Sequence, residues 1–310
     1  MSEGQSGILQ PRVLIPFAVI TLIWGSTWIV IKDQIGSVPP PWSVTYRFTI
    51  AATMMFAYAA WKGFPLRIGR RGHVLALAFG LPQFFINFNF VYAAEHYITS
   101  GLVAVLFALL LVPNTAFGWL FLKHRITRRF LIGSVIATIG VVLLFVQEIR
   151  ATSLAPEAVL IGIGFTVIAI LAASVANVMQ ASEDLRARPI ASMLAWGMAY
   201  GVIADALFAF ATHGPPVIET RLGYWLGLLY LGVVASALAF TFYFGVIRAI
   251  GPGKAAYSGL LVPIIAMTFS TVFEDYHWST LAVAGGLLAL LGLFIALQSS
   301  KPTPASSEAG

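Results

Sequence analysis

The sequence predicts an all-α polytopic membrane protein with ten transmembrane helices, arranged as two inverted five-helix repeats around a central cavity. Three observations support this fold class: the composition, a duplicated motif and the distribution of basic residues. Of the 310 residues, 59% are hydrophobic and only 10% are charged, whereas soluble domains are about a quarter charged. A chain with so few charges cannot cover a water-soluble surface.

The duplicated motif is Leu-Val-Pro, which occurs in long apolar runs at residues 111–113 and 261–263. Each copy is followed by a run with small residues at helical spacing: Gly133, Ala137 and Gly140, then Gly285, Ala289 and Gly292. Steps of four and three residues place them on one helix face, and such a face lets two helices approach closely in lipid. Two related halves of five helices follow. Because five is odd, the second half must enter the bilayer from the opposite side.

Ten apolar runs each have close to the ~20 residues that cross a hydrocarbon core. They are 13–31, 42–61, 73–94, 99–122, 129–147, 158–182, 190–212, 223–247, 254–273 and 279–298. The chain is therefore divided into a cytoplasmic N-terminal segment (1–12), a first repeat (13–147), a second repeat (158–298) and a disordered cytoplasmic tail (299–310). The first run ends at Lys32-Asp33 instead of a small-residue cleavage site, so we interpret it as a helix and not as a signal peptide.

Lysine and arginine are distributed unevenly between the two sets of loops. Fourteen of the 18 lie on one side, three (Lys32, Arg150 and Arg221) lie on the other, and Arg47 lies within a span. Because basic loops stay in the cytoplasm, we expect both termini of this inner-membrane protein to be cytoplasmic. The net charge of +6 then reflects topology, and it requires no nucleic-acid partner.

Several classes of chemistry are excluded by the residues present. The chain has no cysteine, which excludes disulfides, thiolate metal sites and thiol nucleophiles. The five histidines are scattered over span ends and loops, without an H-E-x-x-H motif. There is no P-loop, and no lysine lies in the middle of a span. The sequence thus predicts neither an enzyme nor a cofactor or metal site.

Prolines interrupt several of the predicted spans. A proline frees a carbonyl one turn earlier and bends the helix. We interpret Pro16 and Pro82 as packing kinks. Pro113 and Pro263 recur at matching places in the two halves, so a hinge or kink that shapes a cavity is as consistent with their positions as simple packing.

Two ionisable side chains, Arg47 and Asp205, lie clearly inside predicted spans. Such charges are costly in lipid and are often functional, but both lie near the outer ends of their helices. For Arg47 we predict snorkelling or a structural ion pair with Asp33 or Glu95. Asp205 lies toward the outer end of its helix and is either a structural acid, which we favour, or a proton carrier.

Uncharged polar and aromatic residues gather at similar depth in several spans. Gln83 and Asn87 are one helical turn apart and share a face, which should look toward other helices or water because bare amides are unsatisfied in lipid. Interhelical hydrogen bonding is the competing interpretation for any single residue. Taken together, the polar residues at similar depth in several spans favour a water-filled central cavity. The residues predicted to bind a substrate there are Trp24, Gln83, Asn87, Tyr92, Asn177, Tyr243 and Tyr257.

Several short motifs follow one another along the chain, and some of them have a counterpart at the matching place in the second half. They are Trp24-Gly25-Ser26-Thr27-Trp28, Tyr46-Arg47-Phe48, the stretch 92–99 with its counterpart 244–251, the two Leu-Val-Pro segments and the paired glycines. In these motifs the chain resembles the EamA-like branch of the drug/metabolite transporter superfamily, over all ten predicted helices, and most of all its YddG-type exporters of aromatic amino acids. The family pattern has a glutamate eleven residues after each helix-four and helix-nine proline. Glu274 matches it, whereas His124 departs from it.

The resemblance implies a ten-helix basket with a central cavity, built by the first four helices of each half, with the fifth and tenth packed peripherally. It also implies a transporter that exports amino acids, aromatic or other apolar ones, by alternating access. The alternatives are an exporter of drugs, organic cations or nucleosides, and, from another class, a non-transporting membrane receptor. The expected partners are a small-molecule solute and the lipid bilayer. Flux into sealed vesicles separates a transporter from a receptor.

Overall fold

The computed structural model describes residues 11–36, 38–123, 126–151, 155–250, 255 and 258–298, and all regular secondary structure in this part of the chain is helical. The first half contains α1 (Pro11–Gln34), α2 (Pro40–Trp61), α3 (Gly69–Gly80), η1 (Leu81–Ile86), α4 (Asn87–Ala94), α5 (Ser100–Ala108), α6 (Leu111–Leu122) and α7 (Arg128–Ala151). The second contains α8 (Pro156–Gln180), α9 (Glu183–Arg186), α10 (Ile190–His213), α11 (Leu222–Leu229), η2 (Tyr230–Leu238), α12 (Ala239–Ile250), α14 (Ser258–Phe273) and α15 (Thr280–Gln298).

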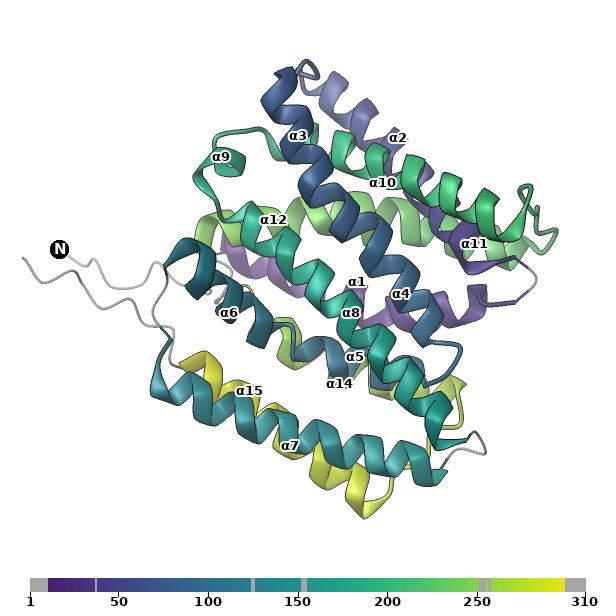
Figure 1. Ribbon diagram of the computed structural model, residues 1–310, viewed down its shortest axis with the longest axis vertical. Helices are drawn as coiled ribbons and strands as arrows, with labels where there is room; N and C mark the ends of the chain where they lie inside the picture. The colour runs from purple at the N-terminus through teal and green to yellow at the C-terminus, as the bar shows by residue number, and fades with distance from the viewer. Residues whose placement is uncertain are drawn as a thin grey trace, which may run out of the picture.

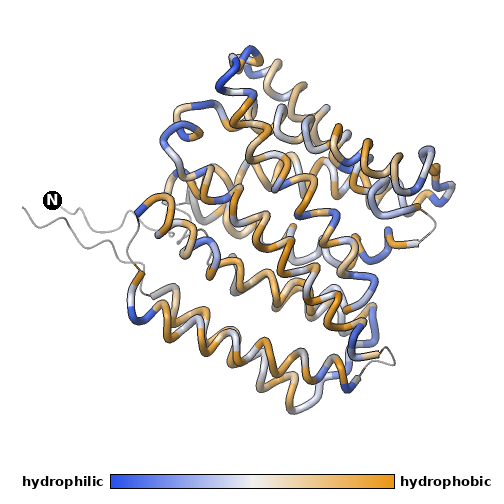
Figure 2. Tube along the Cα trace, in the orientation of Figure 1, coloured by the Kyte–Doolittle hydropathy of each residue, from blue (hydrophilic) through white to orange (hydrophobic). Residues whose placement is uncertain are grey.

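The described part of each predicted span falls largely on helix, although residues 254, 256 and 257 of the ninth span lie outside the described residues. Six helical stretches are long and apolar enough to cross a membrane, and Val262–Phe273 and Thr280–Ala296 are shorter apolar helices. Figure 2 shows hydrophobic residues along the middle of the helices and hydrophilic residues at their ends. This distribution is that of a multi-pass membrane protein, whose apolar belt faces lipid.

Three of the spans are not continuous α-helices. The stretches η1 and η2 are π-helical and occupy equivalent places, each in the third long span of its half. Pro82 accounts for the first, since its missing N–H prevents an α-helical hydrogen bond. The fourth span breaks at Leu109 and Leu110, one turn before Pro113. A proline bend frees backbone groups at this distance.

The main helix contacts join one half of the chain to the other. Helix α7 packs along α15, α2 along α10, α1 against α14, and α8 against α4 and α6. In Figure 1 the pair α7 and α15 lies along one edge, while α2, α3 and α10 lie at the opposite edge. Helices α1, α4, α5, α8, α12 and α14 lie between these edges and surround the middle of the protein.

The contact between α7 and α15, which we call the glycine seam, confirms the predicted close approach. A β-carbon placed on Gly133 would lie 2.3 Å from the backbone nitrogen of Ala296, and one on Gly140 would lie 2.3 Å from that of Ala289. One on Gly292 would lie 2.2 Å from the backbone nitrogen of Ala137. The two backbones therefore touch directly, and only glycine fits at these three positions without a shift of the opposite main chain.

Loops that the charge distribution assigns to one side do lie together. At one end, Arg71 pairs with Asp184 at 2.7 Å, and Arg188 donates to the carbonyl of Ile68 at 3.0 Å. At the other end, Arg221 pairs with Asp33 at 2.8 Å. These contacts agree with the prediction that the loops around Arg71 and Arg188 share one end of the protein, while the side of the membrane on which that end lies stays a prediction.

Candidate functional site

A cavity of about 120 Å³ lies between the two halves, and we call it the central cavity. Helices α1, α2, α4, α5, α6, α8, α12 and α14, together with η1, contribute to it. Its lining residues are Trp24, Thr27, Trp28, Ile31, Arg47, Gln83, Asn87, Phe88, Val91, Ala104, Phe107, Ala108, Leu110, Leu111, Asn114, Ala173, Asn177, Phe240, Tyr243, Val262 and Pro263. The cavity is thus mostly apolar, with a few polar groups at defined places, as is usual for small-molecule sites.

The amides of the cavity carry polar atoms that have no protein partner. Gln83 comes from η1, and Asn87 is the first residue of α4. The Nδ2 of Asn87 donates to the backbone carbonyl of Gln83 at 3.3 Å. The side-chain oxygens of both residues are buried, and so are both polar atoms of Asn114, yet none forms a hydrogen bond in the described structure. Buried polar groups are normally satisfied, so these atoms require water or a bound solute.

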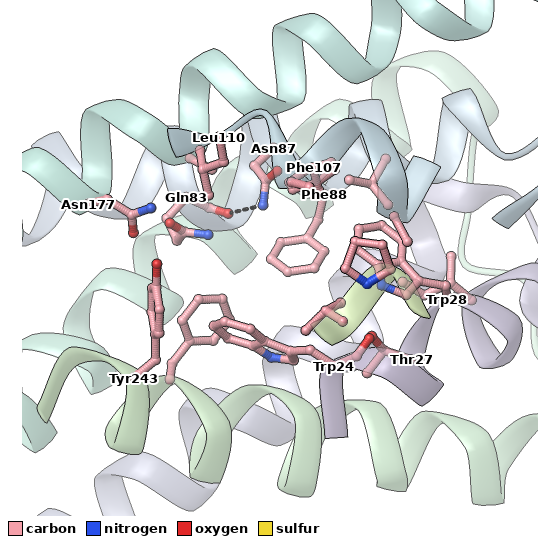
Figure 3. A pocket seen from close by; sticks show the side chains of 18 of the residues that line it. Trp24, Thr27, Trp28, Gln83, Asn87, Phe88, Phe107, Leu110, Asn177 and Tyr243 are labelled. Carbon is pink, nitrogen blue, oxygen red and sulfur yellow. Dashed lines mark hydrogen bonds between the residues drawn. The ribbon is translucent and has the colours of Figure 1, made fainter. Parts of the chain in front are cut away.

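Aromatic rings face the amides across the cavity. Figure 3 shows Trp24 and Tyr243 on one side of the opening and Gln83 and Asn87 on the other. The indole of Trp24 meets the ring of Tyr243 edge-on, with centroids 4.8 Å apart, and its Nε1 donates to the carbonyl of Ala235 in η2 at 3.2 Å. That hydrogen bond fixes the ring, so the aromatic wall is formed before a solute arrives.

Five of the predicted substrate-binding residues meet at this cavity: Trp24, Gln83, Asn87, Asn177 and Tyr243. Tyr92 is not among the lining residues. Its hydroxyl donates to Oε1 of Gln34 at 3.3 Å behind the wall. Tyr257 lies outside the described residues. Of the two predicted hinge or kink prolines, Pro263 lines the cavity, and Pro113 is flanked by Leu111 and Asn114, which also line it.

Arg47 is a lining residue that the sequence did not place in the site. Its side chain is only 1% exposed, its Nε donates to Oγ of Ser236 at 3.0 Å, and its guanidinium lies 4.3 Å from the ring centroid of Phe88. The predicted ion pair is wrong, because Asp33 is bound by Arg221 instead and neither carboxylate oxygen of Glu95 has a hydrogen-bonding partner. Counting turns along the helix gives depth in the membrane. It does not show which face of the helix carries the residue, and the face of α2 that carries Arg47 points toward the central cavity.

Asp205 lies apart from the central cavity. It is 0% exposed and accepts a hydrogen bond from Nδ2 of Asn89 at 2.5 Å. Although Asp205 lies toward the outer end of its helix, α10 turns the carboxyl toward Asn89 and away from the surface. The contact joins α10 to α4, and it is what a structural acid would make.

A second cavity of about 880 Å³ opens at the base-poor end of the protein. It is lined by Ile29, Val30, Lys32, Asp33, His96, Tyr97, Ile98, Thr99, Gly223, Gly227, Phe269, Phe273 and Glu274. Glu274, the glutamate of the family pattern, accepts hydrogen bonds from the backbone N–H of Ser100 at 3.2 Å and from Oγ of Ser270 at 2.6 Å. It therefore fastens the start of α5 to the end of α14. His124 lies outside the described residues.

Glu95 lies beside this second cavity, directly after α4, and is 0% exposed. Lys32 donates through Nζ to its backbone carbonyl. Burial raises the pKa of the Glu95 carboxyl well above 4.5, the charge of Lys32 opposes this rise, and the nearby Glu274 adds to it. Burial and the charge of Lys32 lower the pKa of His96.

Comparisons with known proteins agree with this architecture. Residues 13–146 and 160–298 each match the EamA-like transporter family. The uncharacterized transporter YoaV of Bacillus subtilis is 24% identical over 290 residues, which cover 92% of this chain and 96% of that protein. A probable amino-acid metabolite efflux pump of Salmonella typhimurium is 24% identical over 289 residues, covering 89% of this chain and 92% of its own length.

The fold also has a counterpart among solved structures. One crystal structure superposes with a TM-score of 0.68 at 19% sequence identity, and the match covers 91% of this chain and 95% of that one. The two family matches, one in each half, indicate a duplicated chain. This family consists of transporters and not of enzymes. The chain, a multi-pass membrane protein, belongs to the EamA-like transporter family.

Proposed function

We propose that this protein exports amino acids or similar small metabolites across the inner membrane by alternating access through the central cavity. The observation that carries the proposal is the set of buried, unpartnered amide atoms of Gln83, Asn87 and Asn114, which share a cavity with aromatic rings. Polar groups of a solute would satisfy the amides, and an apolar or aromatic side chain would pack on the rings. Relatives bearing the name amino-acid metabolite efflux pump support the same substrate class.

The charges of the cavity favour amino acids over organic cations. No aspartate or glutamate is among its described lining residues, whereas Arg47 is. A cation inside a low-dielectric cavity needs a negative partner, and this lining offers it a positive one. Nucleosides carry no charge that would use Arg47, so they also fit less well. The same cavity in a receptor would bind solute without moving it.

The transport cycle that fits this architecture is a movement of one half against the other. In the proposed topology the ten helices cross the bilayer as two inverted repeats, with both termini cytoplasmic and the second cavity facing outward. The solute site lies where α1, α8 and α14 meet residues of both halves. Pro113 and Pro263 flank this site and would act as hinges, because their helices lack one backbone hydrogen bond each.

Counterflow in proteoliposomes tests the transport function. Liposomes containing the purified protein are loaded with one unlabelled amino acid at a time, and uptake of the labelled form is followed. Transient accumulation above equilibrium is expected for at least one aromatic or other apolar amino acid, and protein-free liposomes serve as the control. Binding of label without accumulation would indicate a receptor. Counterflow of organic cations or nucleosides, with none of amino acids, would replace the proposed substrate class.

Single cysteines test the topology, since the native chain has no thiol. We expect Thr220→Cys, near the base-poor end, to react with an impermeant maleimide in intact cells. Gly63→Cys, near the base-rich end, should react only after the cells are opened. The reverse pattern would overturn the proposed orientation.

A further inference from the structure

Arg47 is the one charged side chain among the described residues that line the central cavity. It is 1% exposed, and its Nη1 has no hydrogen-bonding partner. The ion pairs of the described chain are Arg71 with Asp184 and Arg221 with Asp33, so no carboxylate oxygen in it lies within 4.0 Å of this guanidinium. Among the described residues, this buried guanidinium therefore has no carboxylate at ion-pair distance, and Glu95 acts on it only at longer range.

The guanidinium is held in place by neutral groups. Ser236 in η2 accepts from its Nε at 3.0 Å, and the ring of Phe88 lies 4.3 Å away as a cation–π partner. The hydroxyl of Tyr92 also interacts with it. That tyrosine is in turn fixed by Gln34 at 3.3 Å, and Gln34 donates to the carbonyl of Tyr224 at 3.2 Å. The side chain is thus anchored on several sides, while Nη1 remains free for a further acceptor.

An isolated buried charge costs several kcal/mol unless it is paired. The guanidinium fork matches a carboxylate through two parallel hydrogen bonds. Because no carboxylate of the described residues pairs with this guanidinium, a solute that enters the cavity is the natural source of one. The side-chain oxygens of Gln83 and Asn87 are also unpartnered, and as acceptors they suit the ammonium group of the same solute.

We propose that Arg47 binds the carboxylate of the transported solute and that the protein therefore selects carboxylated solutes, either zwitterions or anions. This inference rests on the proposed transport function and deepens it.

Matched solutes that differ only in the carboxylate test the inference on the wild-type protein. The probes are phenylalanine, its amide and phenethylamine, each as a competitor of counterflow and as a stabiliser against thermal unfolding in detergent. We expect phenylalanine to act at concentrations about tenfold to a hundredfold lower than the other two, which is the usual effect of a hydrogen bond to a charged group. Equal potency of all three would overturn the role of Arg47.

Substitutions locate the effect at one residue. Arg47→Gln should reduce the preference for phenylalanine over phenethylamine to about one, and Arg47→Lys should keep part of it because a point charge remains. Arg71→Gln, at an exposed ion pair on the surface, is the matched control and should keep the full preference. If Arg47→Gln also keeps it, the inference is wrong.

The two readouts separate this inference from the proposed function. Flux that is equal for carboxylated and decarboxylated solutes would leave the transport function standing and reject the role of Arg47. Thermal stabilisation that depends on carboxylate and on Arg47, without any flux, would support the site and reject transport. Neither flux nor stabilisation by phenylalanine or another amino acid would reject both.

Discussion

The glycine seam and the central cavity both join the two halves of the chain, and they do so by opposite means. In the seam, the backbones of α7 and α15 meet so closely that a single β-carbon on Gly133, Gly140 or Gly292 would collide with the opposite main chain. In the cavity, large side chains meet around open space, and several of their polar atoms have no partner. The seam is closely packed along the two backbones, whereas the cavity contains open space and polar atoms without hydrogen-bonding partners.

The difference follows from what each contact is built of. Lipid tails are as apolar as leucine, so the seam gains its stability from close packing over its whole length and not from hydrophobic burial. The cavity gives up packing and hydrogen bonds that a solute can supply later. A protein whose halves must move apart at one place needs a second place where they stay together, and the seam at the edge of the molecule meets that need.

The largest expected effect comes from filling the seam. In Gly292→Leu, the added side chain starts 2.2 Å from the backbone nitrogen of Ala137, so α7 and α15 must separate. We expect a loss of ~3 kcal/mol in the free energy of unfolding, the upper range for an overpacked core, measured by thermal unfolding in detergent. Gly286→Leu, on the same helix with nothing within 4 Å, is the control. Equal melting temperatures of the two variants would show that the seam is not a tight contact.

A smaller effect on stability, but a clear one on transport, is expected in the cavity. Asn87→Leu removes an amide whose oxygen no protein group satisfies and whose Nδ2 makes one long hydrogen bond within its own helical segment. The fold should therefore be kept, while counterflow falls roughly tenfold through the lost hydrogen bond to the solute. Asn89→Leu on the same helix breaks the contact with Asp205. It should lower thermal stability and leave flux per folded molecule unchanged. Unaltered flux in Asn87→Leu would mean that this amide is not part of the solute site.

Glu95 tests whether unpartnered polar atoms are tolerated outside the cavity. Its raised pKa means that the folded protein holds the proton more tightly than the unfolded chain does. Wild-type stability should therefore fall as pH rises from about 4.5 toward the raised pKa. Glu95→Gln cannot ionise, so we expect it to melt about 2–4 °C higher than wild type at pH 8 and to lose this advantage at pH 5.

Exposed Glu183→Gln is the control for that comparison and should leave the pH profile of melting unchanged. A wild-type profile that is flat between pH 5 and pH 8 would show that folding does not raise the pKa of the Glu95 carboxyl, and one that rises would show that its charged form is stabilised, with Lys32 as the source of the stabilising charge.

The smallest effect is expected at Asp205, which belongs to neither region. In Asp205→Asn the introduced amide oxygen still accepts from Asn89, so counterflow should change by no more than about twofold. Uptake is measured with and without an imposed pH gradient. If wild-type accumulation follows the pH gradient, and if Asp205→Asn abolishes that accumulation while counterflow survives, Asp205 is the proton carrier. That result would contradict our preference for a facilitative exporter.

Local patterns in the sequence predicted a large part of the fold. Hydropathy and the spacing of Gly133, Ala137 and Gly140 depend on residues within a few turns, so the spans and the seam were both predicted and are seen in the structure. The pairing of base-rich loops was predicted for the same reason. The inverted orientation of the halves in the membrane stays a prediction.

The site was predicted less completely, because it depends on which face of each helix turns inward. Gln83 and Asn87 were found since amides are rare in lipid-facing positions. Phe107 and Phe240 resemble many other apolar residues of their spans, so nothing local marks them as lining residues. Arg47 was judged by its distance from a helix end, and Tyr92 by its chemistry alone. To predict whether either side chain faces the cavity, one must know how its helix is rotated about its own axis.

The π-helical stretch η1 changes that rotation within a single span. Before it, α3 packs mainly against α10, and after it, α4 packs against α8. In an α-helix each residue advances the chain by ~100° around the helix axis. A π-helical turn holds one extra residue, so the side chains that follow it point in different directions from those of an uninterrupted α-helix. The third span therefore packs against another helix over α3 and contributes residues to the central cavity over η1 and α4. Shortening Leu81–Ile86 by one residue would rotate Asn87 out of the cavity without altering its chemistry.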